Sequence, residues 1–282
     1  MFSPANKSEA AALIRKHTFT PIKKYGQNFL VDGNIIGKIV AAALLNGGDT
    51  VIEIGPGLGA LTFPLAREAG RVIAVEADEK IIPLLREAAA EAGAPDNLDI
   101  VNADFMEYEL PASGGYKLVG NLPYYITTPI LMRAAEAPNL PELVVCMMQR
   151  EVAQRITAAP GGKSYGAVSV AVQYRFRAEY LFDVPAAVFM PKPAVDSSVI
   201  RLTPLSGADA RAAQNERTFF ALVKAGFGQR RKMLRNSLKT AGFGDMAIEA
   251  AFAEAGISPM ARAEQLSVAD FIKLADAVEG KE

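Results

Sequence analysis

Side chains suited to chemistry gather in one short segment, residues 117–125, with the sequence Lys-Leu-Val-Gly-Asn-Leu-Pro-Tyr-Tyr. Its first three residues predict the end of an apolar strand, which we expect Gly120 to interrupt. Asn121 then offers one acceptor and two donors, and Pro123 stiffens the turn and leaves nearby carbonyls free to face a ligand. Tyr124 adds a flat ring for stacking. These groups suit a planar heterocycle with an exocyclic amine, but a proline-ended turn with a buried tyrosine is an equal alternative from this segment alone.

A glycine-rich turn elsewhere in the chain indicates where a second ligand would bind. Residues 50–54 predict a β-branched strand, and a helix is predicted over 60–69. Between them, Gly55, Gly57 and Gly59 form a Gly-x-Gly-x-Gly turn. Strand, glycine turn and helix N-terminus together are typical of the nucleotide-binding corner of a doubly wound sheet. The spacing differs from the Gly-x-Gly-x-x-Gly fingerprint of dinucleotide-binding proteins.

Carboxylates follow the next two predicted strands. Glu76 follows a strand over 71–75, where it could accept hydrogen bonds from ribose hydroxyls or, alternatively, cap the next helix. Asp104 follows a strand over 98–101, where it could accept a hydrogen bond from a cofactor adenine beside the apolar Phe105. Strands that alternate with helices and carry polar groups at their carboxyl ends predict an α/β fold with a parallel sheet.

Two irregular segments could close over a ligand. In residues 188–197, two prolines predict an extended loop that would hold Phe189 out of the core. Its ring could then cover a base on the face opposite Tyr124; the alternative is core packing. Residues 22–32 are too irregular for a helix, so they predict either a flap whose polar groups, Asn28 among them, close over a ligand or a loop pinned to the core.

Composition narrows the possible chemistry. The chain has 282 residues, of which 50% are apolar and 22% charged, with a net charge of −1; this suits one large domain and a smaller one. The single cysteine, Cys146, and the single histidine, His17, exclude an internal disulfide, a cysteine-rich zinc site and a histidine triad. We therefore expect no metal. The chain shows neither a leader-like segment nor about 18 consecutive apolar residues, so we expect a cytoplasmic protein without a membrane span.

A second domain is expected after a turn-rich boundary. We place a sheet-containing catalytic domain with an N-terminal flap at 1–204 and a helical domain at 205–282, with helices over 209–227, 230–241, 246–255 and 267–278. The second domain holds a basic run without carboxylates, whose members are Lys224, Arg230, Arg231, Lys232, Arg235 and Lys239. Such a run predicts contacts with nucleic-acid phosphates despite the near-zero net charge.

Several motifs together give the chain a family resemblance from about residue 23 onward. The motifs are Tyr25-Gly26-Gln27-Asn28-Phe29-Leu30, Glu53-Ile54-Gly55-Pro56-Gly57-Leu58-Gly59, Asn121-Leu122-Pro123-Tyr124, Phe189-Met190-Pro191-Lys192-Pro193, and Gln229-Arg230-Arg231-Lys232 followed by Arg235-Asn236-Ser237-Leu238. In this order they resemble the bacterial small-subunit (16S) rRNA adenine N6,N6-dimethyltransferases, also called kasugamycin-sensitivity methyltransferases. The resemblance implies a Rossmann-like class I methyltransferase sheet with S-adenosylmethionine as methyl donor.

The resemblance also implies a target and a set of site residues. The target would be two neighbouring adenosines in a hairpin loop near the 3′ end of small-subunit rRNA, each methylated twice. We expect a monomer that acts on small-subunit rRNA or a pre-30S particle, and the precursor form stays open. The cofactor would contact Asn28, Leu30, Gly55, Gly57, Glu76, Asp104 and Asn121. Catalysis would use Asn121, the Pro123 carbonyl, and stacking by Tyr124 and Phe189.

Three alternatives stay open at this point. Large-subunit rRNA adenine dimethyltransferases share the chemistry, although their cofactor turn usually lacks the Gly-Pro-Gly-Leu-Gly form. A dinucleotide-dependent oxidoreductase is disfavoured by the glycine spacing and the lack of a catalytic histidine. A non-catalytic ribosome-assembly factor would keep the fold and bind precursor subunits.

Overall fold

The computed structural model describes residues 3–20, 27–93, 95–207, 210, 212–229 and 232–279. The chain forms two compact units, the first comprising Met1–Ala153 and Glu179–Pro204 and the second Gln154–Ala178 and Leu205–Glu282. The sequence prediction placed residues 154–178 in the first domain, whereas they pack with the second unit. The reason is visible in their side chains: Tyr165, Val170 and Tyr174 are buried in the same apolar cluster as the C-terminal helices.

A seven-stranded sheet forms the first unit, with the strand order β4-β3-β2-β5-β6-β9-β7. The strands are β2 (Thr50–Ile54), β3 (Arg71–Glu76), β4 (Leu98–Asn102), β5 (Lys117–Asn121), β6 (Leu143–Gln149), β7 (Phe176–Val184) and β9 (Ser197–Pro204). Neighbours from β4 to β6 are parallel, and β9 runs antiparallel to β6. The predicted α/β fold is confirmed. The strand order reverses between β2 and β5, the point at which such sheets bind ligands.

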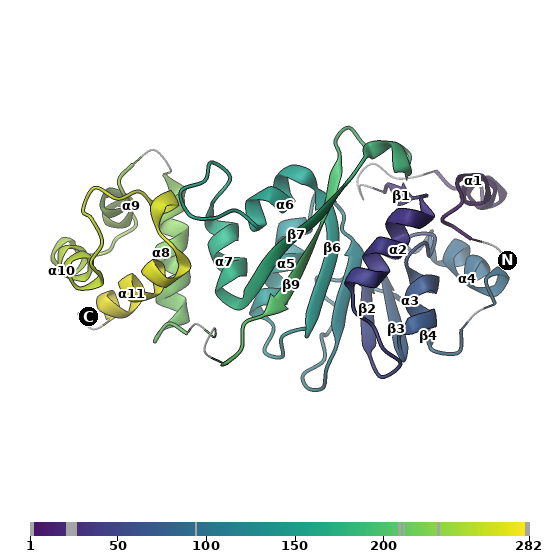
Figure 1. Ribbon diagram of the computed structural model, residues 1–282, viewed down its shortest axis with the longest axis horizontal. Coiled ribbons are helices and arrows are strands. Elements are labelled where there is room, and N and C mark those ends of the chain that lie inside the picture. The colour runs from purple at the N-terminus through teal and green to yellow at the C-terminus, as the bar shows by residue number, and fades with distance from the viewer. Residues whose placement is uncertain are drawn as a thin grey trace. The chain divides into compact units, whose positions relative to one another are not determined.

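Helices cover both faces of this sheet, as Figure 1 shows for α2 and α3 on one face and α5 on the other. The helices are α1 (Lys7–Lys16), α2 (Gly33–Ala42), α3 (Thr62–Glu68), α4 (Ile82–Glu91) and α5 (Thr127–Glu136). Val51, Val119 and Val145, on neighbouring strands, pack into one core with side chains of α2 and α3. Alternate residues of each strand share a face. Glu53 is two positions after Val51 in β2, and Asn121 is two positions after Val119 in β5, so both lie on this same face near the carboxyl ends of their strands.

Strand β5 differs from the prediction at its most informative residue. We expected Gly120 to interrupt the strand, but β5 continues through it to Asn121. A Cβ atom at Gly120 would lie 2.6 Å from the backbone oxygen of Ile54 in β2. Gly120 therefore permits β2 and β5 to approach closely, and β5 places Asn121 at the carboxyl end of the parallel strands.

A short two-stranded ladder joins the N-terminal segment to the proline loop. β1 (Phe29–Leu30) pairs antiparallel with β8 (Phe189–Met190), which follows the 3-10 turn η2 (Ala186–Val188). Phe189 is 2% exposed and packs in the core with Leu30 and α2. The prediction that the loop holds Phe189 out of the core is wrong, because strand pairing turns its ring inward.

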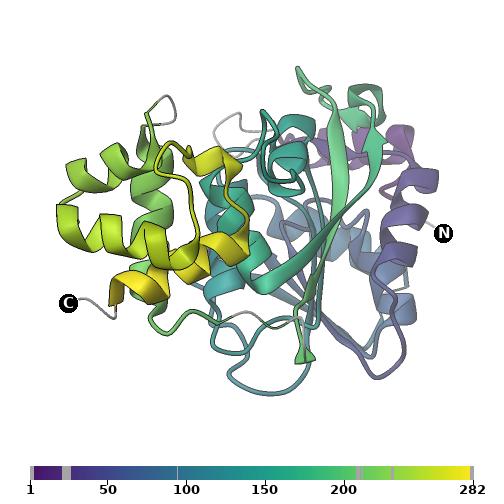
Figure 2. The ribbon, with the colours of Figure 1, turned by 60° about the vertical axis from the view of Figure 1, so that its left-hand side comes forward.

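The second unit is helical (Figure 2). It contains the last part of α6 (Arg150–Ile156), α7 (Ala167–Arg175), α8 (Glu216–Gly228), α9 (Leu234–Thr240), α10 (Asp245–Ala255), the 3-10 turn η4 (Ala263–Gln265) and α11 (Val268–Glu279). At its centre Tyr174 stacks on Phe219 with ring centroids 4.3 Å apart. Among the described residues, none of the helices combines the length and apolar character needed to cross a membrane.

Two helix starts in this unit differ from the prediction. α8 begins at Glu216 rather than near residue 209, because the Asn215 side chain caps it by accepting hydrogen bonds from two backbone N–H groups. α9 begins at Leu234, so Lys232 precedes the helix instead of lying within it.

Candidate active site

A cavity opens at the carboxyl ends of β2, β3 and β5, where the strand order reverses. It brings together nearly all of the residues predicted for the site, namely Asn28, Leu30, Gly55, Gly57, Glu76, Asp104, Asn121, Pro123 and Tyr124. Phe189 does not line it, since its ring is in the core. Segments distant in sequence therefore converge on one pocket, as the predicted parallel sheet requires.

The glycine turn takes backbone conformations that L side chains disfavour. Gly55, Gly57 and Gly59 have φ values of +67°, +56° and +90°. A Cβ atom at Gly59 would lie 2.5 Å from the ring of Phe63. At Gly57 it would lie 3.0 Å from the ring of Phe29 in the N-terminal segment. The turn can thus follow this tight path only because these positions lack side chains.

Glu76 joins the glycine turn to the end of β3. Its carboxylate accepts hydrogen bonds from the N–H of Gly57 (3.2 Å) and the N–H of Asp78 (3.0 Å). Burial raises the pKa of Glu76, while these backbone hydrogen bonds oppose the rise. The two interpretations of Glu76 are compatible, because a carboxylate that caps the next turn keeps further acceptor positions for a ligand.

Glu53 is a functional candidate that we did not select from the sequence. It lies in β2 directly before the glycine turn, lines the cavity, and is 1% exposed. Its Oε2 atom has no hydrogen-bond partner among the described residues. Burial raises the pKa of Glu53 to about 8; the charge of Glu76 adds to the rise and Thr62 opposes it. The sequence did contain a signal for Glu53, because burying a carboxylate inside an apolar strand costs stability and is therefore typical of functional residues.

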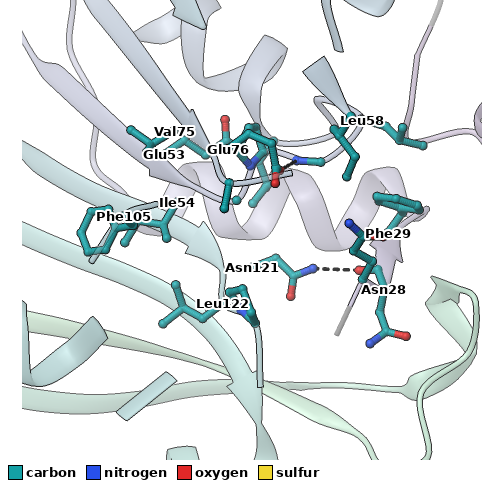
Figure 3. Close-up of a pocket in the computed structure, with 18 of the residues that line it drawn as sticks. Asn28, Phe29, Glu53, Ile54, Leu58, Val75, Glu76, Phe105, Asn121 and Leu122 are labelled. Atoms are coloured by element: carbon teal, nitrogen blue, oxygen red, sulfur yellow. Dashed lines mark hydrogen bonds between the residues drawn. The ribbon is translucent and has the colours of Figure 1, made fainter. Parts of the chain in front are cut away.

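Asn121 is oriented by the N-terminal segment. Its Nδ2 donates to the backbone carbonyl of Asn28 at 2.9 Å. Figure 3 shows the amide nitrogen pointing toward Asn28 and the amide oxygen lying on the other side of the group. Because an amide carries one acceptor oxygen, this arrangement reserves Oδ1 as an acceptor in the cavity. The chemistry expected of Asn121 requires that orientation.

The residues after Asn121 form the entrance to α5. The Pro123 carbonyl accepts hydrogen bonds from the Thr127 hydroxyl (3.0 Å) and the Ile126 N–H (3.2 Å). These bonds occupy the two lone pairs that we predicted would be free for a ligand amine. Tyr124 is half-buried, and Tyr125, 54% exposed, also lines the cavity.

Asp104 and Phe105, which follow β4, line another side of the cavity with one polar and one apolar side chain. Asp104 is exposed, and its Oδ1 accepts a hydrogen bond from the Met106 N–H at 2.8 Å. Phe105 is 4% exposed. Such a pair can hold a planar ring by one edge and one face. Within the described ranges, no cluster of three or more metal-binding side chains occurs.

The basic residues predicted to bind RNA lie in the second unit. Lys224, near the end of α8, and Lys232 are exposed, and Arg235 in α9 is partly exposed. Arg230 and Arg231 lie outside the described residues.

Comparisons with known proteins bear on this geometry. The model of the family described as ribosomal RNA adenine dimethylase matches residues 19–279. The chain is 44% identical to the ribosomal RNA small subunit methyltransferase A of Pelotomaculum thermopropionicum over 98% of both chains. Its structure is similar to a dimethyladenosine transferase from Plasmodium falciparum (TM-score 0.72, 24% identity, 87% of this chain and 95% of that one). It is also similar to the 23S rRNA methyltransferase ErmE (TM-score 0.70, 28% identity, 89% of this chain and 100% of that one).

Proposed function

The chain belongs to the ribosomal RNA adenine dimethylase family, and we propose that it dimethylates N6 of two neighbouring adenosines in the 3′-terminal hairpin loop of small-subunit rRNA. Family membership gives the reaction class, methyl transfer from S-adenosylmethionine to adenine of rRNA. The proposal concerns the subunit, the adenosines and the residues that act on them. The observation that carries it is the Asn121 amide, fixed so that its oxygen is available in the cavity.

The cavity suits the cofactor chemically. S-adenosylmethionine combines an adenine, a ribose and a charged methionine end, and the sulfonium supplies an electrophilic methyl group. Glu76 would accept from the ribose hydroxyls, and Asp104 and Phe105 would hold the adenine. The glycine turn allows the backbone to approach the methionine end closely.

The target base would bind on the Asn121 side of the cavity. The N6 lone pair of adenine is delocalised into the ring, so the amine is a weak nucleophile. Asn121 Oδ1, by accepting a hydrogen bond from N6–H, would favour a tetrahedral nitrogen, and the ring of Tyr124 would stack on the base. Positioning supplies most of the acceleration, because the donor is already reactive.

Substrate binding requires an extruded base. An adenosine in a hairpin loop costs the least to unstack. Lys224, Lys232 and Arg235 would bind phosphates and hold the RNA without reading its sequence. We expect a cytoplasmic monomer acting on a precursor of the small subunit.

The relatives favour the small subunit over the large. The Pelotomaculum protein, named for the small subunit, is 44% identical to this chain, whereas ErmE, named for 23S rRNA, is 28% identical. Both carry out the same kind of chemistry, so the subunit must be tested directly.

The test is transfer of tritiated methyl groups to purified ribosomal subunits, followed by nucleoside analysis. We expect N6,N6-dimethyladenosine in small subunits that lack it, and no label in small subunits that already carry it. Label in large subunits instead would refute the proposal. Asn121→Ala should lower kcat by about 100-fold or more; if the protein were only an assembly factor, the wild type would bind subunits but transfer no label.

A further inference from the structure

A hydrogen bond connects Tyr124 to the last part of the sheet. The Tyr124 hydroxyl lies 2.7 Å from Oγ of Ser197, the first residue of β9. Ser197 is fully buried and is paired in the ladder with Gln149, the last residue of β6. A tyrosine that follows β5 is thus tied at its far end to a different strand.

Ser197 is itself held firmly by its neighbour in sequence. The Asp196 carboxylate accepts hydrogen bonds from the Arg150 guanidinium (2.7 Å) and from the Ala186 N–H (2.9 Å). The Asp196 carbonyl also accepts from the Arg150 N–H at 3.1 Å. Side-chain and backbone contacts therefore fix the segment just before Ser197, and the serine hydroxyl is a rigid anchor.

We propose that Ser197 is a positioning residue that holds the Tyr124 ring in the place where it can stack on the target base. The inference rests on the proposed function. Stacking depends on where the ring lies, and rotation about the first side-chain torsion of a tyrosine swings the whole ring. The phenol oxygen lies on the axis of the second torsion, so the bond to Ser197 fixes the first torsion, and with it the position of the ring, before substrate arrives. Burial raises the pKa of Tyr124, which keeps the phenol protonated and able to share a hydrogen bond with Ser197.

The chain offers a matched control at the next residue. Ser198 is also fully buried, and its hydroxyl lies 2.7 Å from the hydroxyl of Tyr180 and donates to Asp183 at 2.7 Å. Tyr180, Asp183 and Ser198 are not among the residues that line the cavity. Removing the Ser198 hydroxyl therefore breaks a serine–tyrosine hydrogen bond of the same length outside the cavity, at a tyrosine that is 37% exposed. Asp183 keeps its ion pair with Arg150 (3.3 Å) in this variant.

The experiment is a double-mutant cycle on the intact chain, with small subunits lacking dimethyladenosine as substrate. Ser197→Ala and Tyr124→Phe should each lower kcat by about 3- to 10-fold, the worth of one hydrogen bond, and leave the KM for S-adenosylmethionine within about twofold. The double variant should be no slower than either single one, because both remove the same bond. Ser198→Ala should keep kcat within about twofold of wild type.

Three outcomes would overturn the inference. These are an unchanged kcat in Ser197→Ala, losses that multiply in the double variant, and an equal loss in Ser198→Ala, which would indicate a general effect of β9. Should Ser197→Ala not fold, Tyr124→Phe remains decisive, because a phenylalanine that turns over as fast as tyrosine excludes the anchor. An inactive wild type would overturn both this inference and the proposed function, whereas an active wild type with multiplying losses overturns this one alone.

Discussion

Replacing Glu53 with glutamine should stabilise the cofactor-free protein, and the gain should grow with pH. Glutamine has nearly the same shape as a protonated glutamate but cannot ionise. Glu53 is 1% exposed and its Oε2 lacks a partner among the described residues, so ionisation in the folded state is not compensated. Burial accordingly raises the pKa of its carboxyl from 4.5 to about 8.

The direction and size of this stability gain follow from the different proton binding of the folded and unfolded protein. The folded protein holds the Glu53 proton more tightly than the unfolded chain, so the stability from this proton is fully present below pH 4.5 and is lost as pH rises to about 8. Each pH unit in that window costs about 1.4 kcal/mol. Between about pH 5.5 and about pH 7.5, wild type should lose about 3 kcal/mol relative to Glu53→Gln.

Urea unfolding of both proteins across that pH range, without cofactor, measures this difference. Groups that do not interact with Glu53 titrate identically in the two proteins, so the change in the free-energy difference between them reports Glu53 together with its interaction with Glu76. A free-energy difference that stays constant from about pH 5.5 to about pH 8 would refute the reasoning, because it would mean that Glu53 is ionised in the folded as in the unfolded protein and that its pKa is not raised.

Three further variants test other parts of the structure. Phe189→Ala should lower the free energy of unfolding by about 3 to 5 kcal/mol in urea titrations, because the Phe189 ring is part of the hydrophobic core. A variant that is as stable as wild type but inactive would contradict this core role. Gly59→Ala should abolish measurable cofactor binding in calorimetry, since its Cβ would meet Phe63 at 2.5 Å; unchanged affinity would show that the turn adapts. Lys224→Glu combined with Lys232→Glu should raise the KM for RNA and flatten its salt dependence, with kcat little changed; a salt dependence equal to wild type would exclude phosphate contacts.

The location of the site residues was largely predictable because the alternation of strands and helices is encoded locally. Several polar residues lie just after predicted strands, and parallel strands place their carboxyl ends on the same side of the sheet. Glu76, Asp104 and Asn121 could therefore be expected together without any knowledge of distances. Their meeting at one cavity follows from the strand order rather than from the residues themselves.

What the sequence did not reveal depends on partners distant in the chain. Two prolines suggest an extended loop at Phe189, but pairing with Leu30 decides where the ring points. Gly120 was interpreted as a strand breaker because its role depends on Ile54, the backbone it approaches. Likewise, nothing local shows that the Pro123 carbonyl is occupied by Thr127.

The discontinuous make-up of the helical unit has a consequence for any attempt to divide the protein. The Tyr174 hydroxyl accepts a hydrogen bond from the Ala213 N–H at 3.0 Å and donates one to the Glu216 carboxylate at 3.0 Å. Both hydrogen bonds of this α7 side chain therefore go to residues beyond 204. A fragment ending at Pro204 would leave the rings of Tyr165 and Tyr174 in water. It should aggregate rather than survive as a free-standing catalyst, and limited proteolysis near residue 205 should inactivate the enzyme instead of liberating two working halves.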